Sequence, residues 1–446
     1  MTLARTPLAA FGVVLTTACA LLFLLALVVE SFGFIRNPYV GILIFGALPA
    51  GFALGLLLIA IGNLRGRRRG AAEVSWPTID LKKRGQRIFV MGLLAASIVN
   101  VVILSLAGYG AVHYMETTEF CGQVCHSVME PEYVSHAEGP HANITCVSCH
   151  VGSGTDALVR SKLDGTRRLA GFITGNITRP IPTPVQTMRP ARETCGTCHW
   201  PEKIHGDRLK VVREYADDET STETVTTLEL KVGGGSAALG IGEGIHWHMN
   251  VANQVEFIAL DPARQDIPYV KLTMGDGTVR EFRRPGVADA ILAGGTRRRM
   301  DCTDCHSRPS HAFAPSAERA ADAALALDPQ SRSLPFARRE VVKALKTEAP
   351  SKDEALTAID AGLRAFYSGP EMAARPADAD IDRVVRVTKA LYASNVFPQM
   401  KITWGSYRNE LGHIDSPGCF RCHDEEKATE DGRTISQDCE SCHRMR

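Results

Sequence analysis

The sequence predicts a mainly α-helical protein, in which a three-helix transmembrane anchor precedes an exported part with little regular secondary structure and a small antiparallel β insertion. Three observations predict this fold class. Three apolar stretches lie before residue 112, six similar cysteine motifs lie after residue 120, and strand-like runs fill residues 208–284. A chain of 446 residues is long enough for two or three domains.

The three apolar stretches cover residues 8–29, 39–61 and 88–109. Each is long enough to cross a bilayer, which takes about 20 residues. The first stretch is longer than the apolar core of a typical signal peptide and lacks a small-x-small cleavage pattern, so we expect it to stay as an anchor. The predicted anchor therefore comprises residues 1–112.

The distribution of charge predicts the orientation of this anchor. The loop between the second and third stretches carries eight Lys and Arg residues, whereas the loop between the first and second carries only Arg36. The positive-inside rule places the basic loop in the cytoplasm. With three spans, everything after about residue 110 then lies outside the inner membrane of a bacterium, in the periplasm. The sequence has no basic face with interleaved aromatic residues, so it does not suggest nucleic-acid binding.

Six motifs account for twelve of the thirteen cysteines. Five read Cys-x-x-Cys-His, at residues 146–150, 195–199, 302–306, 419–423 and 439–443, and the first reads CGQVCH at 121–126. The cysteines are Cys121, Cys125, Cys146, Cys149, Cys195, Cys198, Cys302, Cys305, Cys419, Cys422, Cys439 and Cys442.

This pattern is typical of covalent haem c, in which two thiols form thioethers and the adjacent histidine ligates the iron. Zinc sites do not need a histidine directly after every cysteine pair. The sequence therefore predicts six haem c groups, whose porphyrins serve as core where the motifs are crowded. Cys19, inside the first apolar stretch, is expected to act as a small buried hydrophobe.

Histidines supply the predicted iron ligands. The six motif histidines are His126, His150, His199, His306, His423 and His443. Further ligands are expected among His141, His205, His311 and His413, which lie near motifs, and among His246 and His248, which flank Trp247. A strand would place the last two on one face, and the sequence does not favour either. His113 and His136 are weaker candidates.

Three segments follow the anchor. Residues 113–207 hold the first three motifs, residues 208–298 form the β-rich insertion, and residues 299–446 combine a helical region with the last three motifs. GDG at 275–277, between two strand-like runs, predicts a hairpin. Ser351 followed by Glu354 predicts a helix N-terminus. The proline-rich run 178–190 is expected to be an extended connector.

Two stretches carry a resemblance to a known family. They are CGQVCHSVMEPEYVSHAEGPHANITCVSCHVG at 121–152 and VRSKLDGTRR at 159–168. Together with the membrane anchor, they resemble the NapC/NirT family of membrane-anchored multihaem quinol dehydrogenases. Members of that family usually have one membrane helix and four or five haems, whereas this chain has three apolar stretches and six motifs.

The resemblance implies a quinol site beside the first haem. In the family a methionine after the first motif can ligate the iron, and Met129 matches it one residue further along, so Met129 and His126 remain alternatives. A lysine and an acidic residue line the quinol pocket in the family, and Lys162 and Asp164 are the matching positions.

The predicted function is oxidation of quinol, such as menaquinol, with electron transfer to a periplasmic or outer-membrane cytochrome or reductase in anaerobic or extracellular respiration. Two alternatives remain. One is a multihaem terminal reductase of a small nitrogen or sulfur oxyanion, which needs an iron with a free face. The other is a haem-wire subunit of a larger respiratory complex, which lacks a quinol site.

Overall fold

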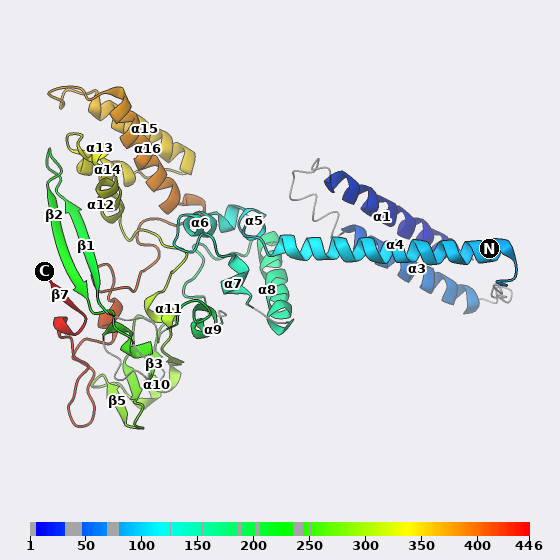
Figure 1. Ribbon diagram of the computed structural model, residues 1–446, viewed down its shortest axis with the longest axis horizontal. Helices are drawn as coiled ribbons and strands as arrows, with labels where there is room; N and C mark the ends of the chain where they lie inside the picture. Colours follow the sequence, from blue (N-terminus) through cyan, green and yellow to red (C-terminus); the bar gives the residue numbers. More distant parts are fainter. Residues whose placement is uncertain are drawn as a thin grey trace. The chain divides into compact units, whose positions relative to one another are not determined.

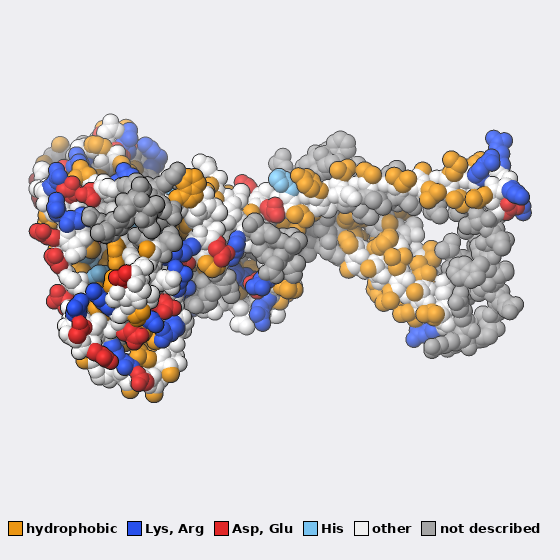
Figure 2. Space-filling model, turned by 60° about the horizontal axis from the view of Figure 1, so that its bottom comes forward, with side chains coloured by type: hydrophobic (Ala, Val, Ile, Leu, Met, Phe, Trp, Pro, Cys, Tyr) orange, Lys and Arg blue, Asp and Glu red, His pale blue; other side chains and the backbone are white. Residues whose placement is uncertain are grey.

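The computed structural model describes residues 6–31, 47–68, 80–124, 126–152, 155–185, 189–200, 206–234, 244–249 and 252–446. The chain divides into two compact units, Met1–Met115 and Glu116–Arg446. Hydrophobic side chains run along the helices of the first unit, whereas charged side chains are prominent on the visible face of the second (Figure 2).

The first unit consists of long helices, α1 (Pro7–Ser31), α3 (Leu48–Arg68) and α4 (Arg84–Met115). Among the described residues, two helices are long and apolar enough to cross a bilayer, over Pro7–Ala26 and Leu48–Gly66. The third predicted span, 88–109, lies within α4, which does not reach that apolar content over its described residues. The structure thus supports two candidate spans rather than three.

Small residues allow α1 and α3 to pack closely. A Cβ atom added to Gly12 would lie 2.7 Å from the carbonyl oxygen of Gly55, and one added to Gly51 would lie 2.7 Å from the Sγ atom of Cys19. Helices in lipid associate through such small-residue contacts, because burial of apolar surface gives little gain there. Cys19 is buried in this contact, as predicted.

A helical core forms one part of the second unit. Its helices are α12 (Ala317–Leu327), α13 (Pro329–Arg332), α14 (Ala337–Leu345), α15 (Lys352–Tyr367) and α16 (Asp378–Asn395). The predicted N-cap is confirmed, since the Ser351 hydroxyl accepts a hydrogen bond from the Glu354 amide. Helices α15 and α16 lie side by side (Figure 1), and α16 buries Ile381, Val384 and Tyr392 against its neighbours.

The predicted β region forms two antiparallel sheets. One has the order β1–β2–β7, from β1 (Arg208–Tyr215), β2 (Glu223–Leu230) and β7 (His443–Met445). The other has the order β5–β4–β3–β6, from β3 (Gln254–Ala259), β4 (Tyr269–Thr273), β5 (Val279–Arg283) and β6 (Thr296–Arg299). The insertion is therefore not self-contained, because the last residues of the chain complete its first sheet (Figure 1).

These sheets position cysteine motifs. The predicted hairpin joins β4 to β5, and Gly277 has a φ of +85°, which favours glycine. Strand β6 leads directly into the fourth motif, and Cys422 of the fifth packs against the buried core of the second sheet around Phe257 and Phe282.

The remaining described elements are short apart from α8. They are α5 (Thr118–Gln123), α6 (His126–Ala137), α7 (Cys146–His150), α8 (Thr155–Ile173), α9 (Ala191–Cys195), η3 (Ile245–Met249), α10 (Asp289–Gly294), α11 (Cys302–Cys305), η4 (Pro398–Met400), η5 (Gly418–Arg421) and η6 (Cys439–Ser441). The predicted connector has no helix or strand over its described residues 178–185 and 189–190.

Candidate functional site

The cysteine motifs lie on neighbouring short helices. Helix α5 of the first motif contacts α7 of the second, α7 contacts α9 of the third, and α9 contacts α11 of the fourth. The Arg421 guanidinium in the fifth motif donates a hydrogen bond to the carbonyl of Asp304 in the fourth. The motifs are thus adjacent in space in the order in which they follow along the chain.

Thiol interactions trace the same order. A hydrogen bond to Cys121 lowers the pKa of the Cys146 thiol to about 6, which connects the first and second motifs. A hydrogen bond to Cys302 lowers the pKa of the Cys195 thiol to about 7, which connects the third and fourth. Cys125 lies outside the described residues.

The other neighbouring motifs interact through buried thiols. Burial, and then the charge of Cys195, raises the pKa of Cys149. Burial and Cys419 raise the pKa of Cys305 to about 12, and the same two causes raise the pKa of Cys442. The described cysteines of neighbouring motifs therefore form one continuous row from Cys121 to Cys442.

Five motif histidines each face a histidine from outside the motifs. The ring centroids are separated by 6.2 Å for His150 and His311, 6.0 Å for His199 and His141, 6.3 Å for His306 and His246, 5.9 Å for His423 and His248, and 6.2 Å for His443 and His413. An imidazole nitrogen lies about 2 Å from a metal that it ligates, so two imidazoles on opposite sides of one ion have centroids about 6 Å apart. All five pairs fit an iron between the rings.

Backbone carbonyls orient four of the five histidines from outside the motifs and one motif histidine, His423. In each of them the Nδ1 atom lies within hydrogen-bond distance of a carbonyl oxygen. The distances are 3.2 Å from His141 to Pro309, 3.1 Å from His246 to Val232, 2.8 Å from His248 to Ile245, 2.9 Å from His311 to Glu132 and 2.7 Å from His423 to Ser436. A carbonyl only accepts, so Nδ1 carries the proton and Nε2 keeps its lone pair for a metal. His413 instead stacks on Phe420, with centroids 4.4 Å apart.

Burial keeps several of these imidazoles neutral, as metal ligation requires. Desolvation lowers the pKa of His150, His248 and His306, and lowers that of His311 to about 4. No three His, Cys, Asp or Glu side chains within the described ranges converge as a conventional metal site would need. The histidine pairs and cysteine pairs therefore fit haem better than zinc.

The structure places His246 and His248 differently from the strand that the sequence suggested. His246 and His248 lie on the 3₁₀ helix η3 and not on a strand, and they face different motif histidines, His306 and His423. Residues two positions apart on a 3₁₀ helix point about 120° apart around its axis, so the two histidines can face separate sites.

The first motif is described only in part. The side chain of His126 and all of His205 lie outside the described residues, while Met129 is half-buried on α6. His136, also on α6, is buried, and its ring lies 5.9 Å from that of His311. The Nε2 atom of His136 lies 2.9 Å from the Ile144 carbonyl oxygen.

Sequence reasoning missed a buried ionic cluster at the fourth motif. Asp304, between the two motif cysteines, accepts hydrogen bonds from Arg264 at 2.8 Å and from the Nε atom of Arg298 at 3.0 Å. Its carboxylate also accepts from the Asp301 amide, completing a capping box at the start of α11. The Asp-x-x-Asp pattern was the available signal, but the arginines are distant in sequence.

The predicted quinol residues both lie on α8. Their positions are two residues apart, so they point about 200° apart around the helix. Lys162, whose side chain is outside the described set, occupies the middle of the face that contains Leu169 and Ile173. Asp164 is exposed on the other face, one turn from Arg160 and Arg168.

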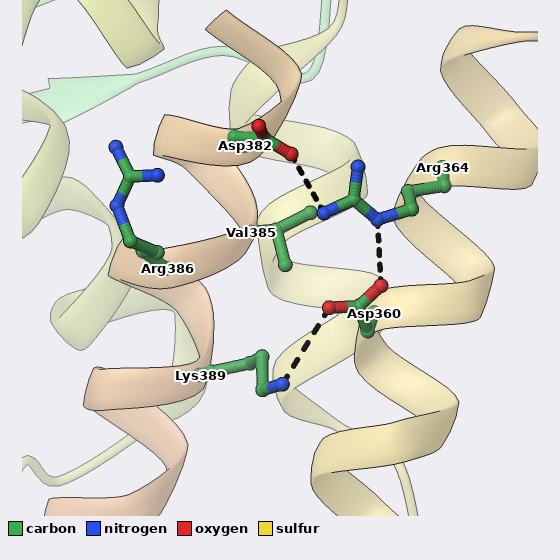
Figure 3. Close-up of a pocket in the computed structure, with 6 residues that line it drawn as sticks. All are labelled: Asp360, Arg364, Asp382, Val385, Arg386 and Lys389. Carbon is green, nitrogen blue, oxygen red and sulfur yellow. Dashed lines mark hydrogen bonds and ion pairs between the residues drawn. The ribbon is translucent and has the colours of Figure 1, made fainter. Parts of the chain in front are cut away.

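A cavity of about 610 Å³ in the described part of the chain lies away from the motifs. It is a shallow depression between α15 and α16, lined by Asp360, Arg364, Asp382, Val385, Arg386 and Lys389 (Figure 3). Arg364 pairs with Asp360 and with Asp382, both at 2.7 Å, and Lys389 pairs with Asp360. The depression contains no motif residue, and its ion pairs link the two helices.

Comparisons with known proteins agree with this arrangement. Residues 83–181 match the family described as NapC/NirT cytochrome c family, N-terminal region. The chain is 37% identical, over 449 aligned residues, to the cytochrome c-type protein ImcH of Geobacter sulfurreducens (strain ATCC 51573 / DSM 12127 / PCA), covering 98% of this chain and 87% of that protein. No solved structure matches. The chain belongs to the NapC/NirT family of c-type cytochromes, which are membrane-anchored, bind haem c covalently and transfer electrons.

Proposed function

We propose that this chain is a membrane-bound hexahaem quinol dehydrogenase, which oxidises a quinol such as menaquinol and passes the electrons to a periplasmic or outer-membrane redox partner. The observation that carries the proposal is the row of six motifs in which five motif histidines face a second histidine at 5.9–6.3 Å. Residues that close both faces of an iron suit electron transfer.

The residues of each haem site follow from this row. The twelve motif cysteines would hold six haem c groups through thioether bonds, and the five facing histidine pairs would supply nitrogen ligands to five of the irons. For the first haem the proposed ligand is Met129 or His126, and His205 is left without an assigned iron. When bound, haem c supplies reversible one-electron oxidation and reduction.

The five facing histidine pairs argue against a terminal reductase, because each pair would close both faces of its iron. Such an enzyme needs an iron that can bind substrate, whereas each of the five facing pairs supplies two imidazoles to one site. The distinction from a haem-wire subunit depends on the quinol site alone.

The anchor is proposed to cross the inner membrane three times, with α4 as the third span, so that the motifs face the periplasm. Residues 1–87 contain ten Lys and Arg against three Asp and Glu, and residues 88–446 contain 40 against 46. A basic cytoplasmic loop and an acidic exported part match the positive-inside rule.

Helix α8 is the proposed quinol site. It exposes Leu169 and Ile173 on one face, at 43% and 74% accessibility, while Arg160 is exposed on the opposite face. A helix with one apolar and one basic face suits a membrane surface, where quinol is dissolved in the lipid. Lys162 and Asp164 are the proposed quinol residues, and the helix geometry ranks Lys162 first.

The haem content provides the first prediction. The intact mass of the mature protein should exceed that of its polypeptide by six haem groups, because six cysteine pairs are available. Cys19→Ala should leave the excess unchanged, since Cys19 is buried between α1 and α3. An excess of five would show that CGQVCH, with its wider spacing, does not attach haem.

Stopped-flow absorbance tests the quinol reaction. The purified full-length protein in lipid nanodiscs should show haem reduction within seconds of mixing with a reduced menaquinone analogue, and the reaction should saturate with quinol concentration. A haem-wire subunit would be reduced by dithionite but not by the quinol. That result would remove the dehydrogenase activity and leave only the electron relay.

A further inference from the structure

A buried ion pair lies behind the second pair of facing histidines. On α6, Glu132 accepts a hydrogen bond from Arg308 at 2.8 Å through its carboxylate, and its backbone carbonyl accepts from the His311 Nδ1 atom at 2.9 Å. The same carboxylate lies 3.3 Å from His311 Nδ1. The side chains of Arg308 and Glu132 are only 10% and 15% exposed, so water screens this pair weakly.

Arg308 is held from several sides. Its Nε atom donates to the His311 carbonyl at 2.6 Å, and its guanidinium carbon lies 4.0 Å from the centre of the Tyr407 ring and 5.0 Å from that of Phe313. Planar stacking and fork-like hydrogen bonding are properties of arginine that lysine lacks. The cluster is therefore rigid, with one carboxylate and one guanidinium fixed beside one imidazole.

We propose that Glu132 and Arg308 are positioning residues that set the reduction potential of the second haem through His311, with opposite signs. This inference rests on the proposed function, in which His311 and His150 ligate that iron. The Glu132 carboxylate beside Nδ1–H makes the imidazole a stronger donor and stabilises the oxidised site. The Arg308 charge offsets this effect.

The location gives the pair a role in the relay. Helix α6 begins at His126 of the first motif, carries Met129, and reaches His311 of the second site through Glu132. A single rigid helix thus carries candidate ligands of the first haem and the potential-setting contact of the second. The step between the first two sites of the row depends on the difference between their potentials.

Spectroelectrochemical titration of the full-length holoprotein tests the proposal. Glu132→Gln removes the negative charge and should raise one of the transitions, changing the reduced-to-oxidised ratio of that site about tenfold at fixed potential, equivalent to about 59 mV. Arg308→Gln should lower the same transition. Arg308→Lys, which keeps the charge, should stay closer to the wild type than Arg308→Gln.

Glu130→Gln is the matched control. Glu130 is also on α6 and also pairs with a cation, Lys352 at 2.7 Å, but it contacts no histidine in the described structure. Its variant should leave every transition in place. Shifts of equal sign for Glu132→Gln and Arg308→Gln would indicate loosened packing alone and would overturn the proposal, as would no shift for Glu132→Gln.

His311→Met separates this proposal from the proposed function. If His311→Met shifts one transition and changes its electron paramagnetic resonance signal, the ligand assignment holds, and Glu132→Gln must then move that same transition. If Glu132→Gln leaves it in place, only the positioning role fails. If His311→Met alters no potential and no resonance signal, the ligand assignment itself fails, and with it this inference.

Discussion

Asp304→Ala is expected to destabilise the second unit by about 3 kcal/mol, because it leaves two partly buried guanidinium groups without their buried carboxylate. The Asp304 side chain is 4% exposed, and that of Arg264 is 11% exposed. Breaking a buried pair by removing one partner costs about 3–5 kcal/mol, and we expect the lower end because Arg298 retains 30% exposure and can turn towards water. Loss of the capping box on α11 adds to the effect.

The measurement is the thermal unfolding midpoint of the holoprotein, followed by far-ultraviolet circular dichroism. Asp304→Ala should lower it by about 6 °C, and Asp304→Asn, which keeps an acceptor for Arg264, should lower it less. Asp289→Ala is the control. It breaks an ion pair with Arg283 in which Asp289 is 91% exposed, and exposed pairs contribute little. Equal unfolding midpoints for the wild type and Asp304→Ala would contradict this prediction. They would mean that water or other side chains replace Asp304 as the partner of Arg264 and Arg298.

The cysteine motifs could be recognised from the sequence because their chemistry is local. A thioether pair and its adjacent histidine occupy five or six consecutive residues, so spacing alone identifies them. The amphipathic face of α16 and the hairpin at Gly277 were predictable for the same reason, since the repeating pattern and the turn residues lie within one segment.

The facing histidines proposed as second ligands depend on long-range contacts that spacing does not reveal. His141 faces His199, and His248 faces His423 across 175 positions. Only the fold of the intervening chain brings such residues together. The strand β7 is a similar case, because three residues after the last motif complete a sheet that begins at Arg208.

The number of membrane spans could not be established from the composition of the apolar stretches alone. Residues 88–109 are apolar enough to predict a span from sequence, yet α4 extends from Arg84 to Met115, beyond the predicted stretch at both ends. A third span within α4 therefore stays a prediction from the sequence, whereas α1 and α3 are supported by their length and composition and by the small residues at their contact.

On helix α8, the family resemblance and the structure together distinguish between the two proposed quinol residues. The resemblance implies that Lys162 and Asp164 line one pocket, but on a continuous helix their positions are about 200° apart. A quinol on one side of α8 can contact one of them directly. By its position, Lys162 shares a face of α8 with Leu169 and Ile173, the face proposed to meet the lipid in which quinol is dissolved.

Lys162→Ala is therefore expected to slow reduction by menaquinol about 10²- to 10⁴-fold, the usual contribution of a positioned base, while reduction by dithionite stays fast. Asp164→Asn should slow the quinol reaction much less, because Asp164 lies on the basic face beside Arg160 and Arg168. Both variants should retain the wild-type haem spectrum. Stopped-flow traces with the two reductants measure all four rates. A larger loss for Asp164→Asn than for Lys162→Ala would place the quinol on the basic face of α8, and wild-type rates for both would place the quinol site on another element, with His113 of α4 and Asp156 as the next positions to vary.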